Sequence, residues 1–230
     1  MSAQAAQPLA AEISNAVQDY AKAVWSLSRP TGEPVSTSAI AERMHVSPAS
    51  ASAMVKRLEV LGLAKRKPYH GVELTAAGER VALEVIRHHR LLELYLAEAL
   101  GMSWDRVHAE AEVLEHVLSE ELEDLIAAKL GNPTRDPHGD PIPSRELVIK
   151  ELPSVALSSL EPGATGTFVR ISDADPAMLR YLAERGIALG DPLEVVEKQP
   201  FGGPLYASFG GAVHILGGRL ADAMYVEVGA

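Results

Sequence analysis

Residues 108–116 read His-Ala-Glu-Ala-Glu-Val-Leu-Glu-His, and this stretch decides how the rest of the chain is interpreted. Four of its side chains can bind a metal ion and recur at positions i, i+4, i+7 and i+8: His108, Glu112, Glu115 and His116. Because a helix turns by about 100° per residue, these positions fall within an arc of roughly 100° and share one face. Imidazole nitrogens and carboxylate oxygens are suitable donors for a divalent metal ion. A solvated helix face rich in Glu and His is the alternative at this point.

A second His/Glu pair favours the metal interpretation. His89 and Glu93 repeat the i, i+4 spacing on the preceding predicted helix, which extends to about Leu100 and stops at Gly101. The next predicted helix covers residues 104–130. The His-Glu-x-x-His spacing of zinc proteases is absent, which excludes that class of metalloenzyme.

The composition limits the class of protein. The chain has 230 residues, of which 47% are hydrophobic, and this is enough for one large domain or two to three small domains with buried cores. It contains no cysteine, so any metal ion must be held by oxygen and nitrogen donors. No apolar run approaches 18 residues, and the N-terminus lacks the pattern of a secretory signal. These features predict a cytoplasmic protein with no membrane partner.

The net charge of −10 is unevenly distributed along the chain. Residues 40–70 contain six basic and two acidic side chains and carry a net charge of +4. Residues 78–128 contain four basic and twelve acidic side chains and carry a net charge of −8. A basic segment joined to an acidic one indicates that nucleic acid is bound by the basic segment alone.

The basic segment has the order of elements of a winged helix-turn-helix. Apolar residues at helical spacing predict a first helix over residues 13–27. Ser36 and Ser47 are capping residues before two short helices, and Pro48 stands at the first position of the second one. Residues 63–74 then predict a β-hairpin that forms the wing. In this arrangement the helix after Ser47 enters the major groove of double-stranded DNA.

Small, hydroxyl and basic side chains on these elements are the candidate DNA contacts. Hydroxyl groups can hydrogen-bond base edges or phosphates, small side chains allow close approach, and lysine and arginine neutralise phosphates. The candidates are Thr37, Ser47, Ala49, Ser50, Ser52, Lys56, Arg57, Lys65, Arg66 and Lys67. An ordinary amphipathic helix followed by a basic hairpin is the alternative interpretation.

After the helices the sequence changes to short apolar runs. Residues 131–143 are rich in turn formers, and a further linker lies near residues 150–162. Five strands separated by glycine turns are predicted at 165–171, 193–197, 205–209, 212–216 and 224–228, with one helix at 175–185. This pattern predicts a small, mostly β domain that forms a barrel.

Several motifs of the chain resemble the diphtheria toxin repressor family. They are Gln18–Lys22, Ile40–Arg43, Ile86–Glu93, Val107–His116 and Asp136–Pro143, and they are spread over most of the chain. The resemblance implies a mainly α fold with a small β domain: a winged helix-turn-helix, a helical metal-binding and dimerisation domain, and a C-terminal SH3-like barrel. The expected domains are residues 1–76, 77–150 and 151–230. A homodimer is expected. Its candidate contacts, for each of which packing in the core is the alternative role, are Leu91, Leu92, Leu94, Leu96, Val113, Leu114 and Val117.

The resemblance also implies two metal sites per subunit. The expected primary ligands are Asp19, Glu112, Glu115 and His116. The expected ancillary ligands are His89, Glu93 and His108. A residue of the C-terminal domain is expected to complete the ancillary site, and the alignment offers Asp175, for which helix capping is the alternative role.

Two positions favour manganese over iron. Iron-responsive members of the family carry Met where this chain has Asp19 and Cys where it has Glu112, whereas the manganese transport regulators carry carboxylates. Hard oxygen donors suit Mn(II). The short, two-domain manganese regulators carry a further carboxylate where this chain has Lys22, so the chain departs from them there. We expect Mn(II), and an iron-dependent repressor of the same family is the alternative.

The expected function is repression of transcription that controls manganese homeostasis. Without metal, the acidic ligands are expected to repel one another and to leave the first helix loosely held. With Mn(II) bound, Asp19 is expected to be tied to the ligands of residues 112–116, which fixes both recognition helices of the dimer for successive major grooves. We expect no enzymatic activity and no small organic substrate. A dinuclear hydrolase gives no role to the winged helix, and a metal-independent DNA-binding protein gives none to the ligands.

Overall fold

The computed structural model describes residues 13–67, 70–151 and 153–229. The chain divides into two compact units. The first comprises the described residues up to His89 together with Val113–Glu123 and Pro143–Val148. The second comprises Arg90–Glu112, Asp124–Ile142 and the described residues from Ile149 onward. Each unit has a hydrophobic core of its own.

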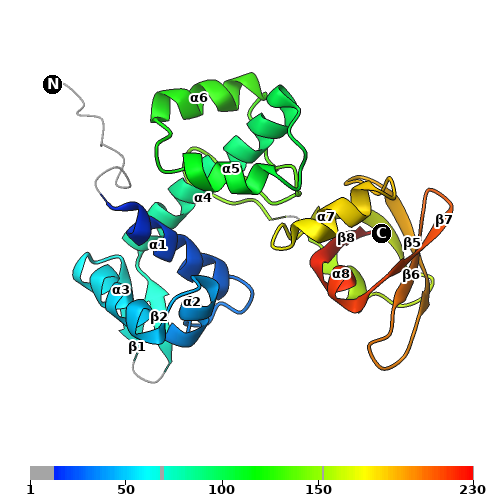
Figure 1. The fold of residues 1–230 in the computed structure, drawn as a ribbon, viewed down its shortest axis with the longest axis horizontal. Coiled ribbons are helices and arrows are strands. Elements are labelled where there is room, and N and C mark those ends of the chain that lie inside the picture. The colour runs from blue at the N-terminus through cyan, green and yellow to red at the C-terminus, as the bar shows by residue number, and fades with distance from the viewer. Residues whose placement is uncertain (1–12, 68–69, 152, 230) are drawn as a thin grey trace. The chain divides into compact units, whose positions relative to one another are not determined.

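The first unit begins with a winged helix-turn-helix (Figure 1). Its elements are α1 (Asn15–Ser28), α2 (Thr37–Arg43), α3 (Pro48–Val60), β1 (Ala64–Lys67) and β2 (Gly71–Leu74). Ser36 and Ser47 each accept a hydrogen bond from a main-chain N–H in the first turn of α2 and α3, as their capping positions predict. The two strands are antiparallel, with Ala64 opposite Leu74. The predicted helices and hairpin are confirmed, while residues 68 and 69 of its turn lie outside the described residues.

The core of the winged helix is built from one face of each helix and the inner side of the hairpin. Helix α1 contributes Val17, Tyr20, Ala21 and Val24, at the i, i+3, i+4, i+7 spacing of a buried helix face. The other members include Ile40, Ala51, Val55, Leu58 and Val72. Since α1 packs against α2, α3 and β2, its orientation is fixed relative to that of α3.

Three further helices follow: α4 (Ala76–Leu100), α5 (Val107–Leu114) and α6 (Glu120–Lys129). The first turn of α4 packs closely on the start of the hairpin, because a Cβ added at Gly78 would lie 1.9 Å from the main-chain oxygen of Leu63. Only glycine fits at this position. The single helix predicted over residues 104–130 is wrong, since the chain leaves helical conformation between α5 and α6.

A six-stranded antiparallel sheet forms most of the C-terminal part of the second unit. Its strands are β3 (Val155–Ala156), β4 (Thr165–Ile171), β5 (Pro192–Lys198), β6 (Leu205–Phe209), β7 (Ala212–Leu216) and β8 (Met224–Val228), in the order β3-β8-β4-β5-β6-β7. A 3-10 turn η2 (Leu157–Ser159) and helices α7 (Pro176–Ala183) and α8 (Gly218–Ala223) complete it. The five predicted strands are confirmed. The short β3 and α8 were not predicted, because they lie in a linker and at a Gly-Gly pair that favour turns.

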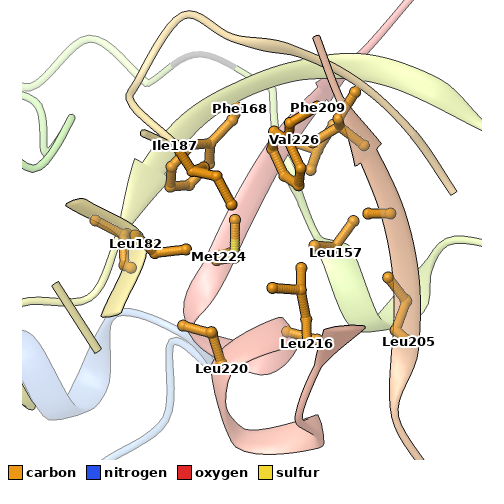
Figure 2. Packing of buried hydrophobic residues seen from close by; sticks show 14 of the residues in the cluster. Leu157, Phe168, Leu182, Ile187, Leu205, Phe209, Leu216, Leu220, Met224 and Val226 are labelled. Carbon is orange, nitrogen blue, oxygen red and sulfur yellow. The ribbon is translucent and has the colours of Figure 1, made fainter. Parts of the chain in front are cut away.

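The core of this β-rich part is enclosed by the sheet and the two helices (Figure 2). Phe168 of β4 is fully buried and lies edge-on to Phe209 of β6, with ring centroids 6.4 Å apart. Leu182 of α7, Leu220 of α8 and Met224 of β8 fill the space around them. The predicted small, mostly β C-terminal domain is therefore confirmed by its strands and its core.

Replacing Phe168 by alanine is expected to lower the free energy of unfolding by about 3–5 kcal/mol, because the change removes a fully buried ring and leaves a cavity. Urea unfolding of the full chain followed by tyrosine and tryptophan fluorescence measures this loss. Phe201→Ala is the matched control, since Phe201 is fully exposed and its loss should change stability by less than about 0.5 kcal/mol. Equal losses in the two variants would contradict the placement of Phe168 in the core.

Candidate metal centre

The first unit contains a cluster formed by Asp19, Glu115 and His116. Asp19 projects from α1, and the other two residues follow directly after the end of α5. His116 Nε2 lies 2.8 Å from Asp19 Oδ1 and 3.5 Å from Glu115 Oε1. The three residues can each offer one ligand atom, and these atoms lie within 4.8 Å of one another. Two carboxylate oxygens and one imidazole nitrogen at this separation fit a divalent metal ion.

The end of α5 at Leu114 places Glu115 and His116 in this cluster. His88 Nδ1–H of α4 donates to the main-chain carbonyl of Glu115 at 3.0 Å, which occupies an oxygen that a continuing helix would use. The hydroxyl oxygen of Ser119 accepts a hydrogen bond from the N–H of Leu122 and caps the next helix. The four ligands predicted on one face of a single helix therefore lie on two different segments.

Two basic groups contact the buried carboxylate of Glu115. Lys22 of α1 donates from Nζ to both of its oxygens, at 3.0 and 2.8 Å, and the Glu115 side chain is 0% exposed. His89 Nδ1 of α4 contacts Glu115 Oε2, and it lies 3.3 Å from Lys22 Nζ. The expected mutual repulsion of the carboxylates is thus offset at Glu115 by Lys22, which ties α1 to the segment after α5.

The imidazole of His116 lies between two acceptors. Its Nδ1 contacts the side-chain oxygen of Gln18, and its Nε2 contacts Asp19. Hydrogen bonding to Asp19 raises the pKa of His116 above its usual value, and the negative charge of Asp19 acts in the same direction. Because a metal ion binds the deprotonated nitrogen, metal binding at this cluster would compete with protonation of His116.

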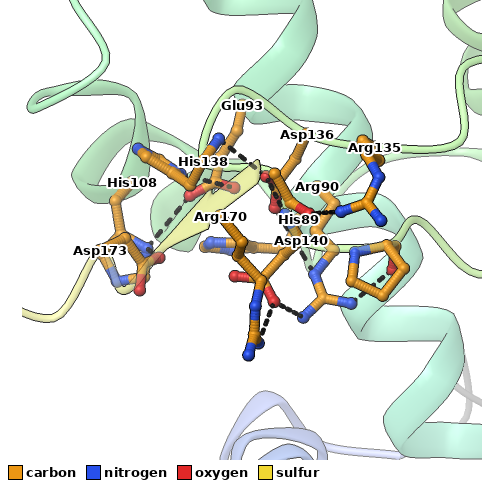
Figure 3. A network of polar contacts seen from close by, with 12 residues as sticks. His89, Arg90, Glu93, His108, Arg135, Asp136, His138, Asp140, Arg170 and Asp173 are labelled. Atoms are coloured by element: carbon orange, nitrogen blue, oxygen red, sulfur yellow. Dashed lines mark hydrogen bonds and ion pairs between the residues drawn. The ribbon is translucent and has the colours of Figure 1, made fainter. Parts of the chain in front are cut away.

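The second unit contains a separate cluster of Glu93, His108 and Asp173 (Figure 3). His108 Nδ1 lies 2.9 Å from Asp173 Oδ2 and 3.2 Å from Glu93 Oε1. Hydrogen bonding to Asp173, then to Glu93, raises the pKa of His108 to about 10. Burial raises the pKa of Asp173, but its contact with the His108 imidazolium lowers it overall. The two carboxylates and the imidazole offer the same donor types as the first cluster.

The structure brings Asp173 into this cluster, whereas the alignment offered Asp175 as the C-terminal ligand. The Asp175 side chain instead caps α7, where it accepts a hydrogen bond from the N–H of Ala177 at 3.0 Å and lies 3.6 Å from Arg219. The Asp175 side chain therefore has the capping role that was the alternative for it, and it lies outside the cluster of Glu93, His108 and Asp173. A local signal favours Asp173: Asp175 stands directly before Pro176, where an acid is a preferred helix cap, and Asp173 is the other acid of this segment, two residues earlier.

The remaining predicted ligands are His89 and Glu112. His89 belongs to the first unit, where its ring contacts Glu115 and Lys22, and it stands one helical turn before Glu93 in the sequence of α4. Glu112 is exposed on α5, with Oε1 3.8 Å from Nε2 of His108. The structure thus places Glu112 beside His108, at the i, i+4 spacing that the sequence predicted.

The turn-rich segment 136–142 packs beside Glu93 within the second unit (Figure 3). His138 is 0% exposed, and its Nδ1 lies 3.7 Å from Glu93 Oε2. Burial lowers the pKa of His138, but contact with Glu93 and the charges of Glu93 and Asp136 raise it to about 9. The segment also approaches β4 closely, because a Cβ at Gly139 would lie 2.1 Å from the main-chain oxygen of Val169. The sequence indicated only turn-forming roles for this segment.

The candidate DNA contacts lie on the surface of the winged helix. Thr37 is half-buried, and the other nine candidates are exposed: Ser47, Ala49, Ser50, Ser52, Lys56, Arg57, Lys65, Arg66 and Lys67. Ser47 and Ser50 share a hydrogen bond of 2.9 Å at the start of α3. Arg66 and Lys67 form ion pairs with Glu59 and Glu73. These pairs are exposed and would exchange readily for phosphates.

Within the described residues, no helix is both long enough and apolar enough to cross a membrane.

Comparison with protein families matches three parts of the chain. Residues 12–72 match the iron dependent repressor N-terminal DNA binding domain, and residues 75–144 match the iron dependent repressor metal binding and dimerisation domain. Residues 155–228 match the FeoA domain. The two repressor ranges contain every residue of the two clusters except Asp173, which lies in the FeoA range.

Similar proteins are metal-dependent repressors. The iron-dependent repressor IdeR of Mycobacterium bovis is 34% identical over 82% of this chain and 73% of that protein. The diphtheria toxin repressor of Corynebacterium efficiens is 31% identical over 82% of this chain and 85% of that protein. A solved structure described as a manganese-dependent transcriptional repressor in complex with manganese is 44% identical, with a TM-score of 0.87 over 92% of this chain and 99% of that one.

Proposed function

Because the chain belongs to the diphtheria toxin repressor family of metal-dependent transcriptional repressors, we propose that it responds to Mn(II) and binds operator DNA as a homodimer. The observation that carries the choice of metal is the donor set of the first cluster. Asp19, Glu115 and His116 supply two hard oxygens and one nitrogen, and the chain contains no cysteine. Carboxylate-rich sites suit Mn(II), and the 44% identical structure named above supports this choice.

The proposed function includes two ions per subunit. One is held by Asp19, Glu115 and His116, with Glu112 as the further predicted ligand. The other is held by Glu93, His108 and Asp173, with His89 as the predicted ligand one turn earlier on α4. When bound, each ion supplies the positive charge that the carboxylates of its cluster share.

Helix α1 links the first cluster to the DNA-binding surface. Its buried face is part of the core that also contains α3, while its polar face carries Asp19 and Lys22. Fixing Asp19 relative to Glu115 and His116 therefore fixes the helix against which the recognition helix packs. This rigid connection supports metal-dependent orientation of α3.

Exposed apolar residues between the end of α5 and the first turn of α6 support a homodimer. Val113 is 71% exposed and Val117 is 75% exposed, and Leu114 and Leu122 are also exposed. Such a group on one short segment is typical of a protein interface. Leu91, Leu92, Leu94 and Leu96 are buried within the subunit, so we exclude them from the proposed interface.

An iron-dependent repressor is the second candidate function. It is favoured by the name of the 34% identical mycobacterial relative, which is described as iron-dependent. Asp19 argues against it, because in this family the iron-responsive members carry Met at this position.

Operator binding is expected to be about 5- to 150-fold tighter with Mn(II) than with a chelator, which is the usual range of coupling between two binding sites. The operator is first selected from random double-stranded DNA in the presence of the protein and Mn(II). Fluorescence anisotropy of the labelled operator then gives the affinity with Mn(II), with Fe(II) under anaerobic conditions, and with EDTA. Equal affinity with Mn(II) and EDTA would overturn the proposal, and activation by Fe(II) alone would favour the second candidate.

A further inference from the structure

The side chain of Gln18 lies beside the first cluster but outside the set of predicted ligands. It is 4% exposed and belongs to the buried face of α1, directly before Asp19 in the sequence. Its amide nitrogen Nε2 lies 3.4 Å from the main-chain oxygen of Ile13. Its amide oxygen Oε1 lies 2.5 Å from Nδ1 of His116. Both ends of this buried amide are therefore engaged, as burial of a polar group requires.

The orientation of the amide determines how the ring of His116 is held. A carbonyl oxygen only accepts hydrogen bonds, so Nε2 of Gln18 donates to Ile13 and Oε1 faces His116. An amide oxygen also only accepts, so Nδ1 of His116 is the donor of that bond. Nε2 of the ring then faces the cluster, where Asp19 Oδ1 lies at 2.8 Å and Glu115 Oε1 at 3.5 Å.

This hydrogen bond does not depend on whether Nε2 of His116 carries a proton. The imidazolium has a hydrogen on Nδ1, and so does the neutral ring that binds a metal ion through Nε2. The acceptor at Nδ1 is thus the same in both forms. The position of the Gln18 amide therefore selects Nε2 as the nitrogen that is offered to a metal ion.

We propose that Gln18 is a positioning residue for the first metal site: its amide oxygen accepts from Nδ1 of His116 and thereby holds Nε2 toward Asp19 and Glu115. This inference rests on the proposed function, because it assumes that Asp19, Glu115 and His116 hold an ion. A fixed acceptor at the second nitrogen sets the tautomer and the ring orientation of a histidine ligand, and its loss typically lowers metal affinity by about 10- to 100-fold.

Two other roles for Gln18 are possible in principle. A direct ligand role is disfavoured, because Oε1 lies at Nδ1 of His116, whereas the oxygens of Asp19 and Glu115 lie at Nε2. A purely structural role would use the other end of the amide, which joins the helix to the main chain of Ile13. Substitutions that keep only one end of the amide separate this structural role from the positioning role.

The test compares Gln18→Met with Gln18→Glu in the full chain. Met offers no oxygen to Nδ1, whereas Glu keeps an acceptor there and loses the donor to Ile13. All chains also carry His108→Ala, which removes the imidazole of the second cluster, so that the remaining ion reports on the first. Each chain is titrated with manganese chloride, and free Mn(II) is measured by electron paramagnetic resonance.

We expect Gln18→Met to bind this ion about 10- to 100-fold more weakly than the chain with Gln18, and Gln18→Glu to bind it at least as tightly. Equal weakening in both variants would overturn the positioning role in favour of the structural one. No loss in Gln18→Met would overturn it as well. Circular dichroism without metal checks that each variant folds. If the chain with Gln18 binds no ion, the first site of the proposed function fails, and this inference fails with it.

The negative charge that Gln18→Glu adds needs a control of its own. Asn15 is exposed about one turn earlier on α1, so Gln18→Met combined with Asn15→Glu adds a charge to the same helix without an acceptor at Nδ1. This double change should remain about 10- to 100-fold weaker than the chain with Gln18. Full recovery of affinity would show that charge explains the effect and would overturn the proposal.

Nitrogen NMR of the labelled imidazole gives a readout that is independent of affinity. With diamagnetic Zn(II) bound, His116 should carry a hydrogen on Nδ1 and the metal ion on Nε2 in the chain with Gln18 and in Gln18→Glu. The Nδ1 hydrogen should exchange faster with water in Gln18→Met, because it has lost its acceptor. A metal ion on Nδ1 in the chain with Gln18 would overturn the assignment.

Discussion

His116→Ala is expected to remove the metal response of operator binding completely. The residue is the imidazole of the first cluster, and its Nε2 lies 2.8 Å from Asp19 of α1. Without it, the cluster keeps only the carboxylates of Asp19 and Glu115. It then has no nitrogen donor to link the segment after α5 with helix α1. The whole coupling of about 5- to 150-fold should vanish, so that affinity with Mn(II) equals affinity with EDTA. Anisotropy of the labelled operator measures both values.

His108→Ala is the matched variant, because it removes an imidazole of the second cluster. It should weaken the response to Mn(II) without abolishing it, since α1 carries no ligand of that cluster. Circular dichroism in EDTA checks that both variants fold. A response that survives His116→Ala, or is lost equally in His108→Ala, would reverse the proposed ranking of the two sites.

The second large effect is expected from Asp19→Met combined with Glu112→Cys, because these two positions distinguish the manganese and iron branches of the family. The change replaces hard oxygen by soft sulfur, so activation by Mn(II) should fall and activation by Fe(II) or Co(II) should rise. Zn(II) should still bind tightly to the natural chain, because affinity tends to follow the Irving–Williams order. Metal occupancy and operator binding must therefore be measured in parallel.

A triple variant that also carries Lys56→Met separates an effect on the choice of metal from an effect on DNA affinity in general. Lys56 is exposed on α3, and its loss should weaken operator binding with every metal alike. An unchanged order of activation in the folded, metal-loaded double variant would place metal selectivity outside Asp19 and Glu112.

The winged helix could be predicted in detail because each of its boundaries has a local cause. Ser36, Ser47 and Pro48 stand at the starts of two helices, and the apolar face of α1 follows one helical period. These signals depend on neighbouring residues alone, so tertiary contacts were not needed to interpret them. The five long strands of the C-terminal part were predictable for the same reason, since alternation and glycine turns are local.

The arrangement of the ligands could not be predicted from helical spacing. The break after Leu114 depends on His88, which is 27 positions away from Glu115 in the sequence and bonds its carbonyl oxygen. The role of Asp173 likewise depends on its distance to His108 across 65 positions, which periodicity does not encode. Ser119 followed by two acids was a local signal for a new helix, and the continuous apolar stripe concealed it.

The position of Lys22 would make metal binding at the first cluster an exchange of cations. Its ammonium group already neutralises the buried carboxylate of Glu115, so an arriving metal ion competes with a charge that is tethered to the protein. A tethered group has a fixed effective concentration, whatever the composition of the surrounding solution. The metal concentration at which the repressor responds would then depend on competition with Lys22 of helix α1 for the carboxylate of Glu115. Lys22 would thus influence metal sensing although it donates no electron pair to the metal.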